Sequence, residues 1–140
     1  MSEHNLWTML RNGLGHRGHL VRLEFNPTPG IPDVSYCLKG VEGFIELKHA
    51  HEFPARSTTA VFGNQGLRDD QIAWIHTRTR HGGRVRIIAQ VDDQIYLIPG
   101  SYCRQFNEMN GHALAKSSAY YAQLPLCKIE WNNLYSSLRN

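Results

Sequence analysis

The 140-residue chain has few cysteines, no long apolar run and only a small excess of charge. Cys37, Cys103 and Cys127 are odd in number and widely spaced, and no CxxC pair occurs, which argues against a disulfide framework or a zinc ribbon. No apolar run approaches the roughly 18 residues of a membrane-spanning helix, and residues 1–13 are too polar for a signal peptide. We therefore expect reduced thiols, no membrane partner and a cytoplasmic location.

The residues that are present favour one folded domain. Hydrophobic residues make up 41% of the chain, which argues against a wholly disordered protein. No internal repeat or long linker divides the sequence, and its length is typical of a single domain. Fifteen Lys and Arg residues against 12 Asp and Glu give a net charge of +3, which would suit a nucleic-acid partner but is also common in proteins that never bind DNA.

Hydrophobic spacing and turn residues predict helices around a sheet in the order α-β-β-β-α-β-β. We expect helices over residues 3–14 and 67–81. We expect strands over residues 19–25, 33–38, 43–48, 84–89 and 94–98, with hairpins turning at Lys39-Gly40 and Asp92-Asp93. Residues 49–66 lack a clear period and are expected to form a mobile loop. After Pro99, short helices are expected over 102–109 and 131–138, with an irregular stretch between them.

The most informative segment is Pro32-Asp33 followed by Glu46-Leu47-Lys48. The expected hairpin brings Asp33 close to Glu46, and the period of two in a strand points Glu46 and Lys48 to the same face. Charged side chains in an otherwise apolar strand cost free energy unless they are paired or bind a metal. The pattern therefore predicts a cluster of ionisable groups with a chemical role.

Two neighbouring carboxylates suit a hard cation such as Mg2+, with Mn2+ as a possible substitute, and the backbone carbonyl of Leu47 could add a third ligand. Such an ion can bind a phosphate oxygen, lower the pKa of a water and stabilise negative charge on phosphorus. Lys48 would lie beside that water.

The ordered set of motifs resembles the PD-(D/E)xK nuclease superfamily, and within it the VRR-NUC branch, whose stand-alone members in bacteria and phages are similar to Holliday-junction resolvases. The matching positions span residues 3 to about 98 and are Glu3, Gly30-Ile31-Pro32-Asp33, Glu46-Leu47-Lys48, Gln71 with Trp74, Gly82-Gly83 and residues 84–89. The resemblance implies a restriction-endonuclease-like fold, an α/β class with a mixed sheet, formed by an α-β-β-β-α-β core over residues 1–100. Residues 101–140 would then form a helical extension of the same domain and a possible dimerisation element.

The resemblance also implies roles for individual residues. Asp33 and Glu46 would be metal ligands, Glu3 would complete the acidic cluster, and Lys48 would orient water or stabilise charge. Gln71 would lie next to that lysine on its helix and belong to the catalytic set.

Structural explanations compete with these roles. Asp33 could cap a proline-rich turn, Glu46 and Lys48 could form a surface pair, and Glu3 could complement a helix dipole. We favour a core position for Trp74 and retain Gln71 as a possible site residue. His49 and His51 could bind zinc, but no further Cys or His lies at ligand spacing, so we expect them to face solvent or phosphate.

Two basic clusters lie on the segments that flank the acidic residues. Such runs are usually solvated surface, but DNA approaching carboxylates requires nearby arginines to bind its phosphates. The candidate DNA-binding residues are Arg17, Arg22, Arg56, Arg68 and Arg84. Nothing indicates reading of base edges, so we expect recognition by shape.

The sequence thus predicts an Mg2+-dependent endonuclease of branched DNA, most of all of four-way junctions, acting in DNA recombination and repair in a bacterial or phage-infected cell. Cutting two strands symmetrically requires two active sites, so we expect a homodimer. The alternatives are a nuclease of flap or restriction-like specificity and a non-catalytic DNA-binding module of the same fold. The least favoured alternative is a structural or assembly protein whose resemblance is coincidental.

Overall fold

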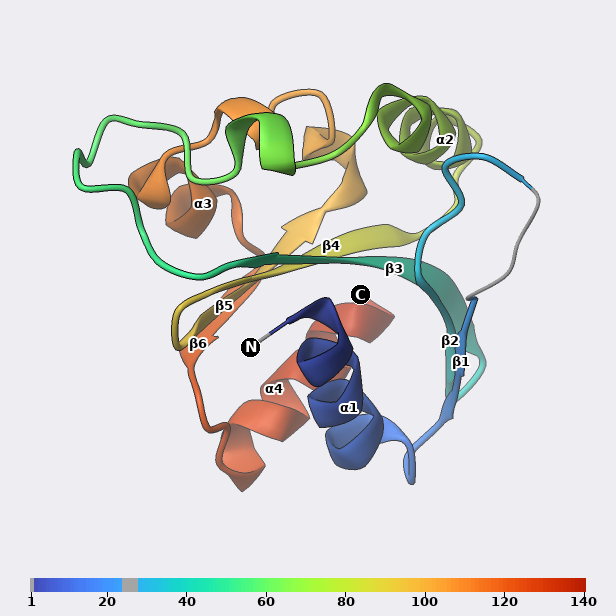
Figure 1. The fold of residues 1–140 in the computed structure, drawn as a ribbon. Helices are drawn as coiled ribbons and strands as arrows, with labels where there is room; N and C mark the ends of the chain where they lie inside the picture. The colour runs from blue at the N-terminus through green and yellow to red at the C-terminus, as the bar shows by residue number, and fades with distance from the viewer. Residues whose placement is uncertain (1, 24–27) are drawn as a thin grey trace.

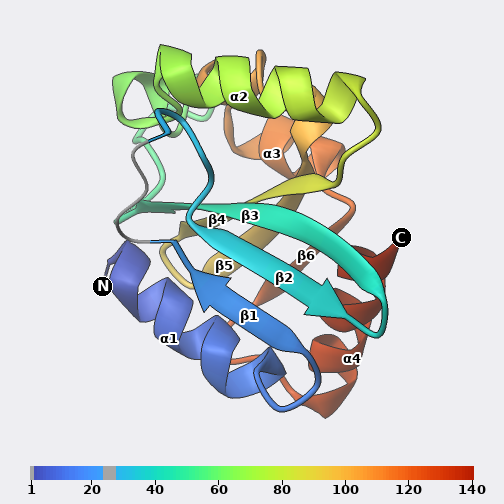
Figure 2. The ribbon, with the colours of Figure 1, turned by 90° about the vertical axis from the view of Figure 1, so that its right-hand side faces the viewer.

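The computed structural model describes residues 2–23 and 28–140 as a six-stranded sheet between two layers of helices (Figures 1 and 2). The strands lie in chain order and are β1 (His19–Arg22), β2 (Val34–Leu38), β3 (Val41–Ala50), β4 (Val85–Val91), β5 (Gln94–Pro99) and β6 (Tyr120–Gln123). All neighbouring strands are antiparallel except β3 and β4, which are parallel. Parallel neighbours need a crossover, and α2 (Asp69–Arg80) supplies it.

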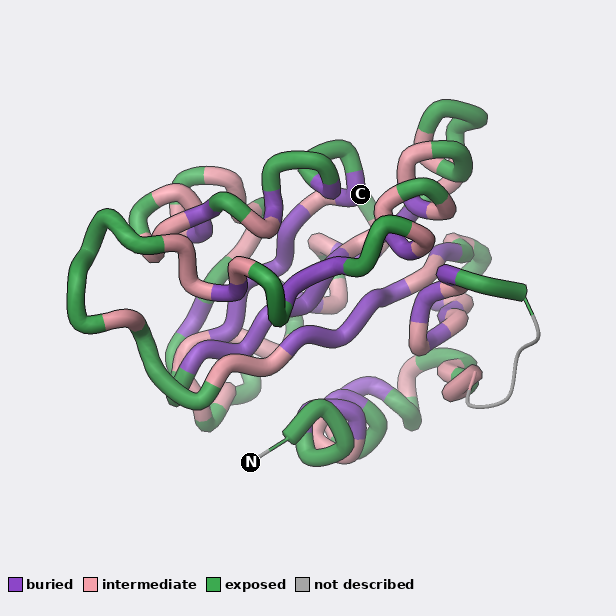
Figure 3. The backbone as a smooth tube through the Cα atoms, turned by 45° about the horizontal axis from the view of Figure 1, so that its top comes forward, coloured by how far each residue is buried: buried purple, intermediate pink, exposed green. Residues whose placement is uncertain are grey.

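Helices cover both faces of the sheet (Figure 1). One face carries α1 (Glu3–Leu14) and α4 (Lys128–Arg139), and the other carries α2 and the shorter α3 (Gly111–Ser117). Each face has its own apolar core, and the central strands between the two cores are the most deeply buried part of the chain (Figure 3). The mixed α/β class expected from the sequence is therefore what the structure has.

The predicted helices and hairpins of the first hundred residues are confirmed, with small shifts at their ends. The first helix begins after the N-cap Ser2, whose side chain accepts a hydrogen bond from the Asn5 amide. The hairpin between β2 and β3 turns at Lys39 and Gly40, whose φ angles of 53° and 85° suit the tight turn that right-twisted strands prefer. Residues 24 and 25 of the strand predicted over 19–25 lie outside the described residues.

The loop predicted over residues 49–66 is partly wrong, because β3 continues through Ala50 and a 3-10 turn, η1, forms at Gly63–Gln65. Parallel pairing with β4 extends the strand, since Ala50 lies opposite Val91. Sequence periodicity alone could not show this long-range pairing.

The last forty residues depart most from expectation. The helix predicted over 102–109 is wrong: two 3-10 turns form instead, η2 (Gly100–Tyr102) and η3 (Phe106–Glu108). The stretch expected to be irregular contains α3 and β6. Asn110 caps α3 through a hydrogen bond from the Ala113 amide, and β6 forms because its four residues pair with β5. The predicted helix over 131–138 is present but longer.

Apolar residues of this C-terminal segment are largely used within the chain. Phe106, Leu114, Leu134 and Leu138 are fully buried in the two cores. Tyr36 of β2 also donates a hydrogen bond from its hydroxyl to the Leu138 carbonyl, at 2.8 Å, and so ties α4 to the sheet. Among the described residues, no helix is long and apolar enough to span a membrane.

Candidate active site

Asp33 stands at the beginning of β2 and is tied directly to the neighbouring strand. Its Oδ2 accepts a hydrogen bond of 2.8 Å from the backbone amide of Leu47, the residue between Glu46 and Lys48. The turn before Asp33 is fixed by Gly30, which has a φ of +83°. A Cβ at Gly30 would lie 2.1 Å from the Asp70 carbonyl oxygen, so only glycine lets this turn approach the start of α2.

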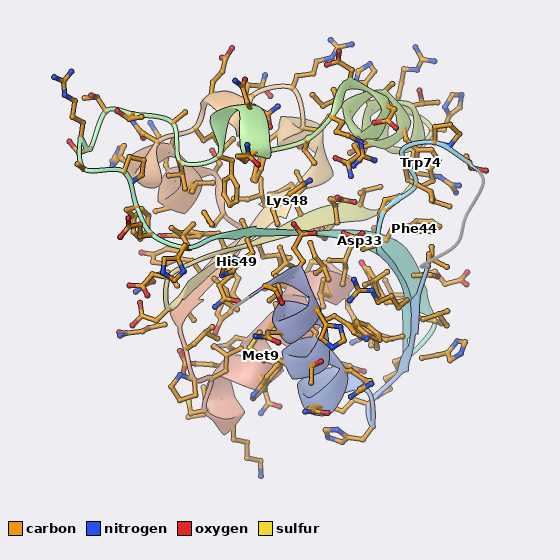
Figure 4. All side chains as sticks on the ribbon, viewed as in Figure 1. Met9, Asp33, Phe44, Lys48, His49 and Trp74 are labelled. Atoms are coloured by element: carbon orange, nitrogen blue, oxygen red, sulfur yellow. The ribbon has the colours of Figure 1, made fainter. Side chains whose placement is uncertain are left out.

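Glu46 and Lys48 extend from the same face of β3, as the period of two predicts, and both are buried under α2. Their exposed fractions are 1% and 7%, and Lys48 Nζ lies 3.6 Å from Glu46 Oε2. Figure 4 shows Lys48 and Asp33 as neighbouring labelled side chains along β3, and the charge of Asp33 acts on Glu46. The structure therefore brings together the three residues of the predicted constellation.

Gln71, in the first turn of α2, joins this group and orients it. Its Nε2 donates to Glu46 Oε2 at 2.8 Å, while its Oε1 accepts from Lys48 Nζ at 3.3 Å. The same Oε1 accepts from the backbone amide of Arg68, at 2.9 Å, in the cap of the helix. One amide thus links β3 to the N-terminus of α2, and the prediction that Gln71 lies beside Lys48 agrees with the geometry.

The electrostatic state of Glu46 is unusual. Burial and, after it, the Asp33 carboxylate raise the pKa of Glu46 from 4.5 to about 8, even though the charge of Lys48 acts in the opposite direction. Its second oxygen, Oε1, is buried without a hydrogen-bond partner. A buried carboxylate with a free oxygen beside a second carboxylate requires either a proton or a cation.

Glu3, at the start of α1, lies at the edge of the same cluster. Burial raises its pKa, and the charges that also act on it are those of Lys48, Asp33, Arg22 and Arg68. Glu3 is nevertheless exposed at its side chain, and among the described residues no group of three or more Asp, Glu, His or Cys is arranged to hold a metal. Asp33 and Glu46 are therefore the core of the acidic site, with Glu3 next to it.

These residues fit a hard divalent cation. Glu46 Oε1 is an unused buried acceptor, Asp33 is only partly buried, and oxygen donors of this kind are the ligands that Mg2+ prefers, together with several waters. Asp33, Glu46 and the carbonyl of Leu47 would hold the ion, and Glu3 could contribute from the first helix.

The five candidate DNA-binding arginines lie in different parts of the fold. The charges of Arg22 and Arg68 act on Glu3, which places both beside the acidic site. Arg56 is exposed in the loop after β3. Arg17 instead lies 3.9 Å from the ring centroid of Tyr135 on α4, and Arg84 donates to the backbone carbonyl of Asn140, so both contact the C-terminal helix region.

The histidines after the motif do not form a metal site in the described part of the chain. His49 and His51 line a small cavity of about 160 Å3 with the β4–β5 turn, and burial lowers the pKa of His49. Trp74, expected in the core, is half-buried and packs edge-on against Phe44 at 5.1 Å between ring centroids. Sequence analysis missed this aromatic pair because Phe44 lies thirty residues earlier, on another element.

No protein-family model matches the chain, and no curated protein matches it. Among solved structures, its fold is similar to that of Hjc, described as a Holliday junction resolvase from the archaeal hyperthermophile Archaeoglobus fulgidus. The TM-score is 0.55, the sequence identity is 15%, and the match covers 83% of this chain and 91% of that chain. The chain therefore has a mixed α/β, restriction-endonuclease-like fold similar to that of this resolvase.

Proposed function

We propose that this protein is a metal-dependent endodeoxyribonuclease that hydrolyses phosphodiester bonds in branched DNA, above all in Holliday junctions. The observation that carries the proposal is the buried Glu46 carboxylate with an unused oxygen, held beside Asp33 and Lys48. The similarity of the fold to a resolvase supports the branched substrate, and the ordered motifs support a place in the VRR-NUC branch.

The residues of the site would have separate roles in hydrolysis. A divalent cation bound by Asp33 and Glu46 would supply a Lewis acid for the phosphate and lower the pKa of a water. Lys48, held by Gln71 and Glu46, places a positive charge where negative charge develops on the phosphate. Gln71 keeps both side chains in position through its two hydrogen bonds.

Branched DNA and two symmetric cuts also favour a homodimer, because each strand needs its own active site. Sedimentation at micromolar concentration tests this part. We expect twice the chain mass of 16.0 kDa, and a species at the chain mass would contradict it.

Cleavage assays test the activity itself. Labelled four-way junction, flap and linear duplex are incubated with Mg2+, Mn2+ or EDTA, beside an Asp33→Asn variant. We expect junction cleavage with either metal, none with EDTA and none with the variant. Equal cleavage of linear duplex would refute the junction specificity, and full activity of Asp33→Asn would refute the site. Tight binding without cleavage in both metals would show a DNA-binding module instead.

A further inference from the structure

The C-terminal half of α2 carries an arginine, Arg78, that is held against two aromatic rings. Its guanidinium carbon lies 4.8 Å from the ring centroid of Trp74 and 5.1 Å from that of Phe44. The two rings meet edge to face, with an interplanar angle of 76°. A guanidinium stacked in this way is attracted to the rings and loses much of its rotational freedom.

The turn after α2 completes the support of this side chain. A Cβ at Gly83 would lie 2.5 Å from Cδ of Arg78, so glycine leaves room for the aliphatic stem. The Gly83 amide also donates to the Arg78 carbonyl oxygen at 2.9 Å. Residues from α2, from β3 and from this turn therefore fix one arginine in one orientation.

The polar edge of Arg78 remains available. Within residues 2–23 and 28–140, its guanidinium forms no ion pair and no hydrogen bond that the structure records, and the residue is exposed. It lines two adjoining cavities, of about 510 and 250 Å3, which it shares with Gly83. Glu42 lines the smaller cavity without pairing with Arg78, while His81 and Arg84 contribute further basic groups.

This pocket lies at a fixed distance from the active site. Phe44 and Lys48 are on the same face of β3 and four residues apart, which corresponds to about 13 Å at a rise of 3.3 Å per residue. Figure 4 shows Lys48, Asp33, Phe44 and Trp74 following one another across the same side of the molecule. Each strand of duplex DNA carries a phosphate about every 3.4 Å along the axis, so a duplex placed with its axis along β3 would have roughly four nucleotides of one strand over this separation.

We propose that Arg78 is a DNA-backbone clamp, which binds a phosphate roughly four nucleotides from the scissile one and thereby positions the substrate. This inference rests on the proposed function, because it assumes DNA in the active site. A planar guanidinium with free donors matches the oxygens of a phosphate. Because stacking on two rings already restricts the rotation of this side chain, less conformational entropy is lost when it binds. A second copy of the chain fits the pocket less well. Two-fold pairing there would place Arg78 and Arg84 of both copies close together, and Glu42 is the acidic residue in the pocket lining that could offset their repulsion.

Salt-dependent binding tests the clamp. Affinity for a labelled four-way junction is measured in EDTA, so that no cleavage occurs, at several salt concentrations. We expect Arg78→Ala to lower affinity roughly tenfold at low salt and to reduce the slope of log K against log salt by about 0.9, the loss of one phosphate contact. Arg80→Ala removes an equal charge from an exposed position on the same helix and should change the affinity less than twofold.

A second measurement locates the contact. Single uncharged methylphosphonate linkages are placed one to eight nucleotides from the cleavage position on either side, or from the branch point if no cleavage occurs. The wild type should lose affinity at a linkage near the fourth, and Arg78→Ala should no longer respond to it. Arg78→Lys, which keeps the charge and the aliphatic stem, should retain the salt slope and lose part of the affinity, and thermal unfolding checks that both variants fold.

The outcomes separate this inference from the proposed function. Arg78-dependent binding without any cleavage would support the clamp and refute the nuclease, whereas normal cleavage with no effect of Arg78→Ala would do the reverse. Equal effects of Arg78→Ala and Arg80→Ala would overturn the clamp, because they would show only a general loss of charge. A halved sedimentation mass of Arg78→Ala with unchanged affinity per site would identify the pocket as a contact between copies, which also overturns it.

Discussion

Replacing Glu46 by glutamine should stabilise the metal-free protein and, on the proposed function, abolish DNA cleavage. Glu46 is 1% exposed, its Oε1 has no partner, and burial and the nearby Asp33 carboxylate raise its pKa to about 8. The folded state therefore prefers a neutral side chain at this position. Glutamine is neutral at every pH, and its amide oxygen can keep the hydrogen bond from Gln71.

The size of the effect follows from the difference in pKa. At pH 7 the folded protein holds a proton on Glu46, whereas the unfolded carboxyl ionises near 4.5, and each pH unit of that difference is worth about 1.4 kcal/mol. The cost is about 3 kcal/mol at pH 7, from which a buried amide nitrogen without a partner would subtract about 1–2 kcal/mol. We expect a net gain of about 1–2 kcal/mol, or roughly 4–8 °C in Tm.

The sign of the pH dependence gives a sharper test than the gain itself. An acid whose pKa is raised by folding stabilises the folded state fully below its unfolded pKa, and this contribution is lost as pH rises through the folded pKa. The difference between Glu46→Gln and the wild type should thus grow from pH 4.5 to about 8 and then level off.

The assay is chemical unfolding in EDTA across pH 4 to 9, with Glu42→Gln as a matched control. Glu42 lies on the same strand but is exposed, so its substitution should leave the pH profile unchanged. Adding Mg2+ should stabilise the wild type much more than Glu46→Gln, because the glutamine amide lacks the negative charge that attracts the ion. A Glu46→Gln variant with the pH profile of the wild type would refute the reasoning.

Three further substitutions test other parts of the structure. Gln71→Ala removes the hydrogen-bond partner of two buried ionisable side chains, Glu46 and Lys48. It should lower cleavage 10- to 100-fold at saturating DNA, measured by single-turnover kinetics, with junction binding in EDTA unchanged. Gly30→Ala should lower the free energy of unfolding, measured in urea, by more than 2 kcal/mol, because its Cβ would meet the Asp70 carbonyl. Gly40 has a similar φ but open space around it, so Gly40→Ala should lower that free energy by about 1 kcal/mol. Equal losses would contradict the close approach at Gly30. Leu138→Ala should cost about 2–5 kcal/mol, and a loss below 1 kcal/mol would show that α4 does not belong to the core.

The acidic strand could be predicted because its signal is local. Glu46 and Lys48 break an apolar run at a spacing of two, and Asp33 follows a turn-forming proline at a distance that a hairpin closes. The period of a strand and the geometry of a hairpin were enough to place all three side chains. Their hydrogen bonds with Gln71 needed the crossover helix as well, which only the ordered motifs indicated.

Features that depend on distant pairing could not be predicted. The strand β6 has four residues and exists because β5 offers an edge, and α3 is a seven-residue helix whose apolar residue Leu114 is buried against that part of the sheet. Neither is long enough to show a period of its own. The stacking of Arg78 on Phe44 and Trp74 was not predicted for the same reason, since the two rings come from β3 and α2.

The parallel pairing of β3 with β4 separates the part of this fold that must keep its geometry from the part that can vary. Both strands and the crossover helix between them are held together by the sheet and the core, to which Phe62 and Leu67 also belong, whereas residues 51–60 are mostly exposed. The entropy of closing a loop rises only slowly with its length. Residues 51–60 can therefore change in length or charge at little cost to stability, and on the proposed function they are where selection could adjust which DNA shapes are accepted while Glu46 and Lys48 keep their positions.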